Sequence, residues 1–173
     1  MRSEIGRLDR LVSDILDYAR PFQLQIEKFS LEKFMTEVTD FYKAVLDRNQ
    51  INFQIESLAM GIEIQADKDK LRQAIVNLIQ NSVEAMKGGG QLTIKIEKVE
   101  KWVRISIKDT GIGISESARG RLFDLFFTTK EQGTGLGLST VRKIVDVHRG
   151  RIDIESVPNG GTTVIVTLPC MVS

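Results

Sequence analysis

The sequence predicts an α/β two-layer sandwich, in which helices pack on one face of a sheet. Two observations predict this fold class. From residue 22 onward the chain contains both helical and alternating strand patterns, and several strand patterns follow one another directly. Strands joined by short connections pair antiparallel, so strands and helices are expected to form separate layers.

Length and composition fit one soluble domain with a helical extension. The chain has 173 residues, of which 42% are hydrophobic and 27% charged. Its net charge of +1 predicts no nucleic-acid partner. The single cysteine, Cys170, excludes a disulfide framework and fits a reducing compartment. No apolar run reaches the roughly 18 to 20 residues of a membrane span, and the charged N-terminus is unlike a secretory signal.

The first element is an amphipathic helix over residues 2–20, which Pro21 ends. Its apolar stripe consists of Ile5, Leu8, Val12, Ile15, Leu16 and Ala19. No partner helix lies close by in the sequence, so the stripe must pack on the rest of the chain or on another molecule. We therefore place the domain boundary at Pro21 and divide the chain into residues 1–21 and 22–173.

The first half of the larger domain alternates strands and helices. "QLQIEKF" reads as a short strand, and Ser30 is the expected N-cap of the next helix. The apolar face of that helix is expected to be Leu31, Phe34, Met35, Val38, Phe41 and Val45. "INFQIES" and "IEIQA" read as strands, and Asp67 caps a long helix that ends at Gly88–Gly90. Its apolar residues are Leu71, Ile75, Leu78 and Val83.

The second half contains four strands and two helices. "QLTIKIEKV" and "KWVRISIKD" alternate as neighbouring strands. A short helix is expected near residues 115–122, followed by a loop and a helix that begins at the glycines of "GTGLGLST". "GRIDIES" and "TTVIVTLP" flank the turn "PNGG" and are expected to form a hairpin.

Two motifs carry polar groups next to expected apolar surfaces. In "NLIQNSVEA", Asn77, Asn81 and Glu84 form one polar stripe of a helix. The stripe is either simply solvent-exposed, or its amide oxygens are ligands for Mg²⁺. In "DTGIG", Asp109 ends a strand and two glycines, Gly111 and Gly113, follow. This is either an ordinary turn or a carboxylate that accepts from the exocyclic amine of a base.

Aromatic residues and a polar loop follow in "LFDLFFTTK". The aromatic residues are Phe123, Phe126 and Phe127. They either belong to the core or anchor a mobile lid that contains Thr128, Thr129 and Lys130. Lys130 would supply a point charge for a terminal phosphate.

The glycine-rich stretch "EQGTGLGLST" contains Gly133, Gly135 and Gly137 at alternate positions. It is not a P-loop, because Leu138 follows the last glycine, and its spacing differs from the dinucleotide fingerprint. Free N–H groups at the start of the following helix form an anion site. In "PNGGTT", Thr162 or Thr163 lies either in a plain hairpin or at the edge of an adenine pocket.

Taken together and in this order, the five motifs closely resemble the N, G1, F, G2 and G3 boxes of sensor histidine kinases. The resemblance covers residues 22–169 as the catalytic ATP-binding domain, and residues 2–20 look like the second helix of the dimerisation and phosphoacceptor domain. It implies an ATP-binding α/β sandwich with a mixed, largely antiparallel sheet, and the cofactors ATP and Mg²⁺. It also implies transfer of the γ-phosphoryl group to a histidine, then to an aspartate of a response regulator receiver domain, within a homodimer. The chain is expected to be cytoplasmic, either as a soluble protein or as the cytoplasmic part of a membrane-associated sensor.

The same resemblance assigns roles to individual residues. Asn81 becomes the magnesium ligand with Asn77 beside it, Asp109 reads adenine, and Gly111 and Gly113 line the base. Phosphate-binding amides come from Gly135, Leu136 and Gly137, the lid contributes Thr129, Lys130 and Gly133, and Thr162 or Thr163 supports the adenine edge. Many relatives carry a basic residue where this chain has Glu84, so no phosphate contact is transferred there. The short lid resembles the nitrogen-regulation branch.

Two other functions share these motifs. Related ATPases carry a glutamate four residues before the magnesium ligand, whereas this chain has Asn77, which cannot act as a general base. A non-catalytic nucleotide-binding docking module is the second alternative. The only histidine, His148, lies roughly 15 Å along its helix from Gly137, too far to accept a phosphoryl group bound there. We therefore expect the acceptor histidine on a helix of the same or a partner subunit that this chain lacks. The chain is expected to bind ATP and to be inactive alone.

Overall fold

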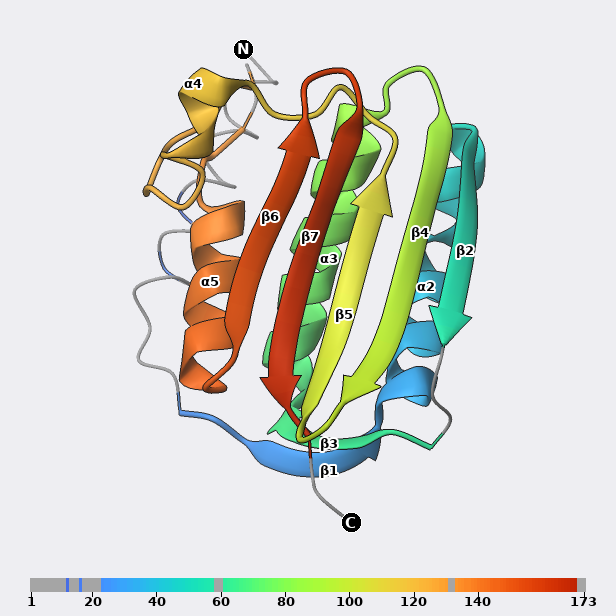
Figure 1. Cartoon of the computed structure of the whole chain (residues 1–173), viewed down its shortest axis with the longest axis vertical. Helices are drawn as coiled ribbons and strands as arrows, with labels where there is room; N and C mark the ends of the chain where they lie inside the picture. The colour runs from blue at the N-terminus through green and yellow to red at the C-terminus, as the bar shows by residue number, and fades with distance from the viewer. Residues whose placement is uncertain (1–11, 13–15, 17–22, 58–60, 131–132, 171–173) are drawn as a thin grey trace.

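A five-stranded sheet with three long helices on one face forms the body of the protein (Figure 1). The computed structural model describes residues 12, 16, 23–57, 61–130 and 133–170. The strands are β1 (Ile26–Ser30), β2 (Ile51–Ser57), β3 (Glu63–Asp67), β4 (Gly90–Val99), β5 (Trp102–Asp109), β6 (Arg151–Val157) and β7 (Gly161–Pro169). The helices are α2 (Leu31–Arg48), α3 (Lys68–Ala85), the one-turn α4 (Glu116–Arg119) and α5 (Gly137–Val147).

The sheet is mixed and largely antiparallel. Its strand order is β2-β4-β5-β7-β6, and only the β2–β4 pair is parallel. β1 and β3 form a separate antiparallel pair across the lower end of the helical layer in Figure 1. The predicted fold class and the predicted β6–β7 hairpin are both confirmed.

Both predicted helix caps are present. The Ser30 hydroxyl accepts a hydrogen bond from the Lys33 N–H (3.4 Å) at the start of α2, and an Asp67 carboxylate oxygen accepts from the Lys70 N–H (2.9 Å) at the start of α3. Because each side chain satisfies an N–H group that has no partner within the helix, each fixes the residue at which its helix begins.

The buried face of α2 differs from the predicted one at two positions. The residues that pack in the core are Leu31, Phe34, Met35, Val38, Tyr42 and Leu46. Phe41 is 81% exposed and Val45 is 41% exposed. The prediction for these two residues was wrong, because the stripe continues from Val38 by four-residue steps and so selects Tyr42 and Leu46.

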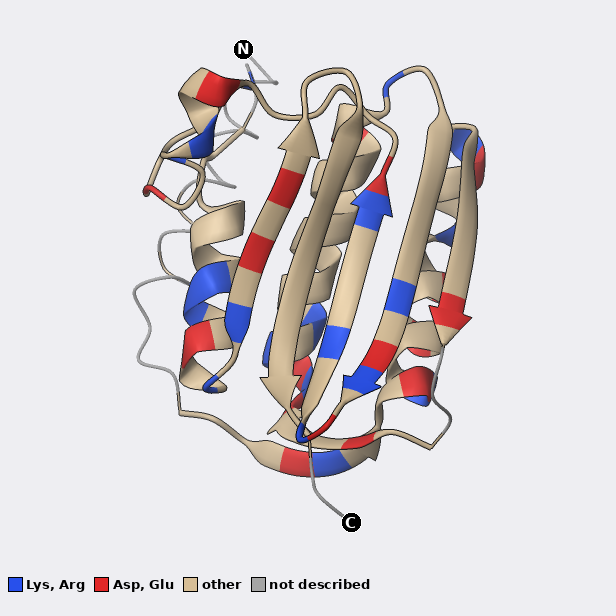
Figure 2. Cartoon of the chain, in the orientation of Figure 1, with Lys and Arg blue, Asp and Glu red and all other residues tan. Residues whose placement is uncertain are grey.

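Strand alternation separates a buried face of the sheet from an open one. In β5 the inward residues are Val103, Ile105 and Ile107, and the next inward position is Asp109. Basic and acidic residues are interspersed along neighbouring strands of the sheet (Figure 2). A carboxylate thus ends a row of fully buried hydrocarbon side chains, on the side of the sheet that faces the helices.

The C-terminal end of α3, the first turn of α5, the end of β5 and the β6–β7 turn all lie at the upper end of the sheet in Figure 1. The helix predicted near residues 115–122 is shorter than expected, because only Glu116–Arg119 is helical and turns follow from Gly120. The predicted helix over residues 2–20 lies outside the described residues except for Val12 and Leu16, which are helical and exposed. Within the described part of the chain, no helix is long and apolar enough to cross a membrane.

Candidate functional site

The centre of the site is the carboxylate of Asp109, which is only 4% exposed. One carboxylate oxygen accepts from the N–H groups of Gly111 (2.9 Å) and Thr162 (3.2 Å), and the other accepts from the Ser82 hydroxyl (3.1 Å). Antiparallel pairing places Thr162 directly opposite Asp109, and Ser82 lies on the buried face of α3. Because a carboxylate has about four acceptor positions, this one retains capacity for one further donor.

Burial raises the pKa of Asp109 above its usual range. The hydrogen bonds from Gly111, Ser82 and Thr162, and the positive charge of Lys130, act in the opposite direction. Asp109 is therefore a desolvated acceptor held in a fixed orientation, which is the property required to read the amine of a flat, partly apolar ligand.

The turn after Asp109 is packed against two other elements. The Ala85 carbonyl at the end of α3 accepts from the Ile112 N–H (3.1 Å), and the Ile112 carbonyl accepts from the Asn159 N–H (2.7 Å). Gly113 has φ +67°, and a Cβ atom there would lie 2.1 Å from the Val157 carbonyl oxygen. Only glycine fits this position, so this turn is held rigidly beside Asp109.

The predicted polar stripe of α3 faces the loop that follows the aromatic residues. Asn77 and Asn81 are half-buried, and Glu84 is exposed. The Lys130 ammonium group donates to Asn81 Oδ1 (3.0 Å) and forms a short ion pair with Glu84. Two oxygens of α3 thus converge on one cationic point, so this donor set fits a divalent cation.

A cation site built only from protein carboxylates is not seen here. Among the described residues, no group of three or more His, Cys, Asp or Glu side chains is arranged to hold a metal ion. An amide oxygen such as Asn81 Oδ1 is a type of ligand that Mg²⁺ accepts, and Mg²⁺ in phosphate-binding sites is usually held mainly by water and phosphate oxygens.

The aromatic residues of "LFDLFFTTK" anchor a loop and are not part of the core. Phe126 is 56% exposed, whereas Phe123 and Phe127 are half-buried beneath guanidinium groups. The Arg142 guanidinium lies 5.0 Å from the Phe123 ring centroid, and that of Arg121 lies 4.5 Å from the Phe127 centroid. Of the two interpretations, the structure supports anchoring.

The glycine loop ends at an uncapped helix. The first intrahelical bond of α5 runs from the Thr140 N–H to the Leu136 carbonyl (2.9 Å), and Leu136 is the buried N-cap. A leucine side chain cannot accept a hydrogen bond, so the amides of Gly137, Leu138 and Ser139 are available at the positive end of the helix dipole. Free N–H groups at a helix start are suited to bind an anion.

Gly135 and Phe126 form the base of the loop. The Phe126 N–H donates to the Gly135 carbonyl (3.1 Å), and both residues have positive φ angles, +65° and +71°. A Cβ atom on Gly135 would lie 2.4 Å from the Phe126 carbonyl carbon. The loop therefore begins and ends at one point, directly before α5.

Of the remaining predicted site residues, some lie close to the loop and the start of α5, and one lies away from Asp109. The Asn77 amide donates to the Gly137 carbonyl (3.5 Å), which joins α3 to α5. The Gly133 N–H donates to the Lys130 carbonyl (3.2 Å), and Thr129 is exposed in the same loop. Thr163 alternates with the inward Thr162, so it lies on the open face of β7 and is not brought to Asp109.

Two serines that the sequence analysis did not select belong to the site. Ser82 donates to Asp109, and the Ser156 hydroxyl lies 3.0 Å from both the Gly161 carbonyl and the Thr162 hydroxyl. The sequence could have indicated Ser82, because this polar residue occupies the next position of the apolar stripe formed by Leu71, Ile75 and Leu78. No sequence pattern distinguishes Ser156, since it is one of several polar residues in an edge strand.

His148 lies at the other end of the helical layer. Its Nε2 accepts from the Asp67 N–H (2.8 Å), and its Nδ1 lies 2.7 Å from the Ile144 carbonyl oxygen. Since Nε2 accepts, Nδ1 carries the hydrogen and donates. His148 therefore has a structural role as a bridge between α5 and the α3 N-cap.

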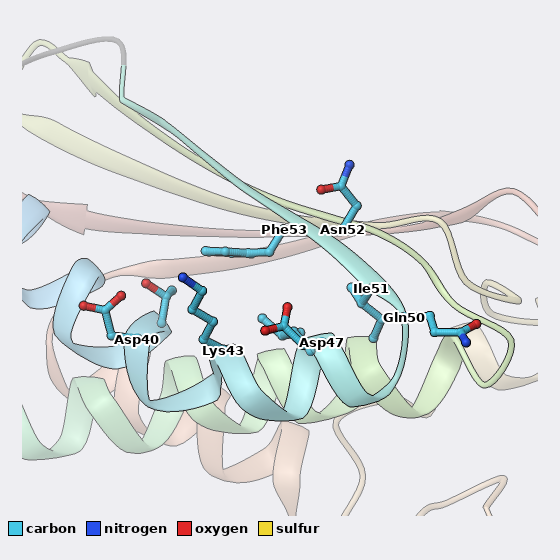
Figure 3. Close-up of a pocket in the computed structure, with 9 residues that line it drawn as sticks. Asp40, Lys43, Asp47, Gln50, Ile51, Asn52 and Phe53 are labelled. Atoms are coloured by element: carbon cyan, nitrogen blue, oxygen red, sulfur yellow. The ribbon is translucent and has the colours of Figure 1, made fainter.

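A hollow of about 520 Å³ lies elsewhere, between α2 and the edge strand β2 (Figure 3). Phe53 and Asn52 from the strand and Asp40, Lys43 and Asp47 from the helix are among its lining residues. None of the predicted site residues lines it. The hollow is therefore separate from the site around Asp109.

Comparison with known proteins agrees with this arrangement. The family model for histidine kinase-, DNA gyrase B- and HSP90-like ATPases matches residues 66–171. Sporulation kinase A of Bacillus subtilis (strain 168) is 35% identical over 168 residues, which are 96% of this chain and 28% of that protein. The curated relatives are thus much longer than this chain.

Solved structures give the same result. The catalytic domain of the histidine kinase ThkA is 35% identical, with a TM-score of 0.78 over 84% of this chain and 95% of that one. The crystal structure of ThkA in complex with the response regulator protein TrrA has a TM-score of 0.84 at 31% identity, covering 97% of this chain and 48% of that one.

The chain belongs to the histidine kinase-, DNA gyrase B- and HSP90-like ATPase family. Within that family, its homologues are sensor kinases and its structural neighbours are histidine kinase catalytic domains, so it contains a histidine kinase catalytic ATPase domain. The family prediction from the five motifs is confirmed.

Proposed function

We propose that this chain binds Mg²⁺-ATP at the upper end of the sheet and transfers the γ-phosphoryl group to a histidine on another helix. A response regulator aspartate then receives the group. The observation that carries the proposal is the buried Asp109 carboxylate, with unused acceptor capacity, in the same site as the uncapped first turn of α5. The reported complex of ThkA with TrrA supports a response regulator as partner.

Each part of the nucleotide has a proposed partner. The adenine amine donates to Asp109, Gly111 and Gly113 form the wall against which the base lies, and Thr162 supports its edge. The amides at Gly135, Leu136 and Gly137 bind phosphate oxygens, and the lid residues Thr129, Lys130 and Gly133 cover them. Thr163 is left out because it lies on the open face of the sheet.

Asn81 would hold Mg²⁺ through its amide oxygen, with Asn77 beside it. When bound, the ion neutralises charge on the β- and γ-phosphate oxygens. The N–H groups at the start of α5 fix the triphosphate in one orientation, and Lys130 adds a positive charge. A bond forms from the acceptor imidazole nitrogen to the γ-phosphorus as the bond to the β–γ bridging oxygen breaks, and ADP leaves.

Hydrolysis by a general base is disfavoured in this site. Asn77 lies where related ATPases carry a glutamate, and its side chain donates to the Gly137 carbonyl (3.5 Å). A neutral side-chain amide cannot take a proton from water at neutral pH. The site is therefore suited to transfer rather than to hydrolysis.

We further propose that residues 1–21 are part of a dimerisation and phosphoacceptor domain, and that residues 22–173 are the catalytic domain. The helical, exposed Val12 and Leu16 support this division, because an apolar stripe on a helix needs a partner. A homodimer, a cytoplasmic location and the short-lid nitrogen-regulation branch belong to the same proposal.

Phosphoryl transfer to an added helix tests the proposal. The chain is incubated with γ-labelled ATP, with and without a peptide pair that supplies the first helix and its histidine. Acid-labile label on the added histidine, dependent on Mg²⁺, is the expected result. Label on His148 of the isolated chain, or binding of ATP without any transfer to the supplied helix, would contradict it.

A further inference from the structure

Lys130 is the one lid residue whose side chain reaches α3 in the described part of the loop. Its ammonium group binds Asn81 Oδ1 (3.0 Å) and the Glu84 carboxylate, 46 residues away in the sequence. Asn81 and Glu84 are three residues apart, so they lie on one face of α3. One cation is thus held by two side chains of the same helix.

The backbone around Lys130 restricts where this side chain can reach. The Lys130 N–H donates to the Thr128 hydroxyl (3.1 Å), and the Lys130 carbonyl accepts from the Gly133 N–H (3.2 Å). The Phe126–Gly135 hydrogen bond closes the base of the same loop. A short closed loop therefore delivers Lys130 to the face of α3 that carries Asn81.

The contact occupies a group that the proposed nucleotide complex needs. Asn81 Oδ1 is the atom proposed to bind Mg²⁺, and two cations cannot share it at bonding distance. Glu84 contributes the stronger partner, because an ammonium binds a carboxylate more tightly than a neutral amide. Without Glu84, Asn81 alone would hold the lysine only weakly.

We propose that Glu84 is a positioning residue that holds Lys130 over Asn81 when no nucleotide is bound. Entry of Mg²⁺-ATP displaces the ammonium group from α3, and Lys130 moves from the carboxylate to the terminal phosphate. The inference rests on the proposed nucleotide site. In the nucleotide-free protein, Glu84 keeps the Lys130 ammonium group on Asn81 Oδ1, the proposed metal ligand.

Acylation of lysine side chains in the nucleotide-free protein tests the first half, because a paired ammonium reacts more slowly than a free one. Glu84→Gln should raise the acylation rate of Lys130 about two- to five-fold, the range of an exposed ion pair. The matched control is Glu37→Gln, which removes the carboxylate that pairs with Lys68 (3.2 Å) and Arg72 (3.3 Å). It should accelerate Lys68 and leave Lys130 unchanged, and Glu84→Asp should restore partial protection.

The affinities for Mg²⁺-ATP and for adenosine test whether the nucleotide displaces Lys130 from Glu84. Glu84→Gln should tighten Mg²⁺-ATP by a similar factor and leave adenosine unchanged, since adenosine needs neither Asn81 nor Lys130. In a Lys130→Met background this gain should vanish. An unchanged Lys130 acylation rate in Glu84→Gln, or a gain that persists without Lys130, would overturn the inference. Failure of all variants to bind ATP would instead count against the nucleotide site, because the acylation result does not depend on it.

Discussion

Asp109 combines a low exposed fraction with three hydrogen bonds to its carboxylate. We expect Asp109→Asn to weaken ATP binding by about 1–3 kcal/mol, the range for a lost charge-assisted hydrogen bond, and to reduce the preference for adenine over guanine. Calorimetric titration with both nucleotides measures this. Unchanged affinity together with unchanged base preference would assign Asp109 to the turn alone.

The same substitution should change how stability depends on pH. Because burial raises the pKa of Asp109 above its usual value of 3.8, the folded state binds this proton more tightly than the unfolded state. That contribution is present below pH 3.8 and is lost as the pH rises through the higher folded-state pKa. The free energy of unfolding of the wild type should therefore fall relative to Asp109→Asn over this interval, as measured by urea unfolding. A difference that does not vary with pH would contradict the prediction.

Gly113 offers a test at a single backbone position. We expect Gly113→Ala to destabilise the fold by more than the roughly 1–3 kcal/mol of a left-handed non-glycine residue, since its Cβ would also collide with Val157. Gly120→Ala is the matched control, because a Cβ there meets nothing within 4 Å and φ is −71°. Urea unfolding of both variants gives the comparison. Equal stability of the two variants would rule out the described packing of the turn.

Between elements, His148 joins the end of α5 to the start of α3. We expect His148→Ala to lower the free energy of unfolding by about 1–3 kcal/mol, because the buried Asp67 N–H loses its partner. Nucleotide affinity should change little, since the proposed phosphate site lies at the opposite end of α5. Asp146→Ala serves as control, because the side chain of Asp146 forms a long, exposed ion pair with Arg142 (3.9 Å). A large loss of nucleotide affinity in His148→Ala would show that the two ends of α5 are coupled.

The strands and caps could be predicted from sequence because their signals are local. Ser30 and Asp67 precede regular apolar patterns, and β2 matches its predicted residues from Ile51 to Ser57. The alternation of β7 also indicates that Thr162, and not Thr163, points toward the helices. Val164 and the later inward residues of this strand are separated from Thr162 by even numbers of residues, so they lie on the same face. The alternation of β7 therefore decides between the two threonines.

Other parts of the site depend on contacts between distant segments. The Lys130–Glu84 pair spans 46 residues, and no local pattern indicates which acidic residue a loop lysine will meet. Phe41 shows the opposite failure, since a local pattern placed it in the core although α2 presents only one side to the sheet. In both cases the arrangement of the layers decides, and that information is not local.

For the whole molecule, ligand binding should be visible as added stability. ATP that binds only the folded state at about 100 times its dissociation constant should contribute about 2.7 kcal/mol. Chelation of Mg²⁺ should remove much of this increment, and Asn81→Ala should remove the Mg²⁺-dependent part without lowering the Tm of the nucleotide-free protein. Thermal unfolding with ATP, with ATP and chelator, and without ligand gives all three values. An Asn81→Ala variant that retains the full Mg²⁺-dependent increment would exclude Asn81 as the ligand.

Because of the hydrogen bond between Phe126 and Gly135, the length of the loop has little influence on the stability of the fold. Because the two ends already meet, added residues only increase the entropy lost on loop closure, by about 0.6 kcal/mol for each doubling of length. We therefore expect insertions and deletions between these two residues to be tolerated far better than a change at Gly135, where a Cβ atom would collide with the Phe126 backbone. Evolution can lengthen, shorten or replace the proposed cover of the nucleotide while the sheet, the helices and the proposed adenine contact stay as they are.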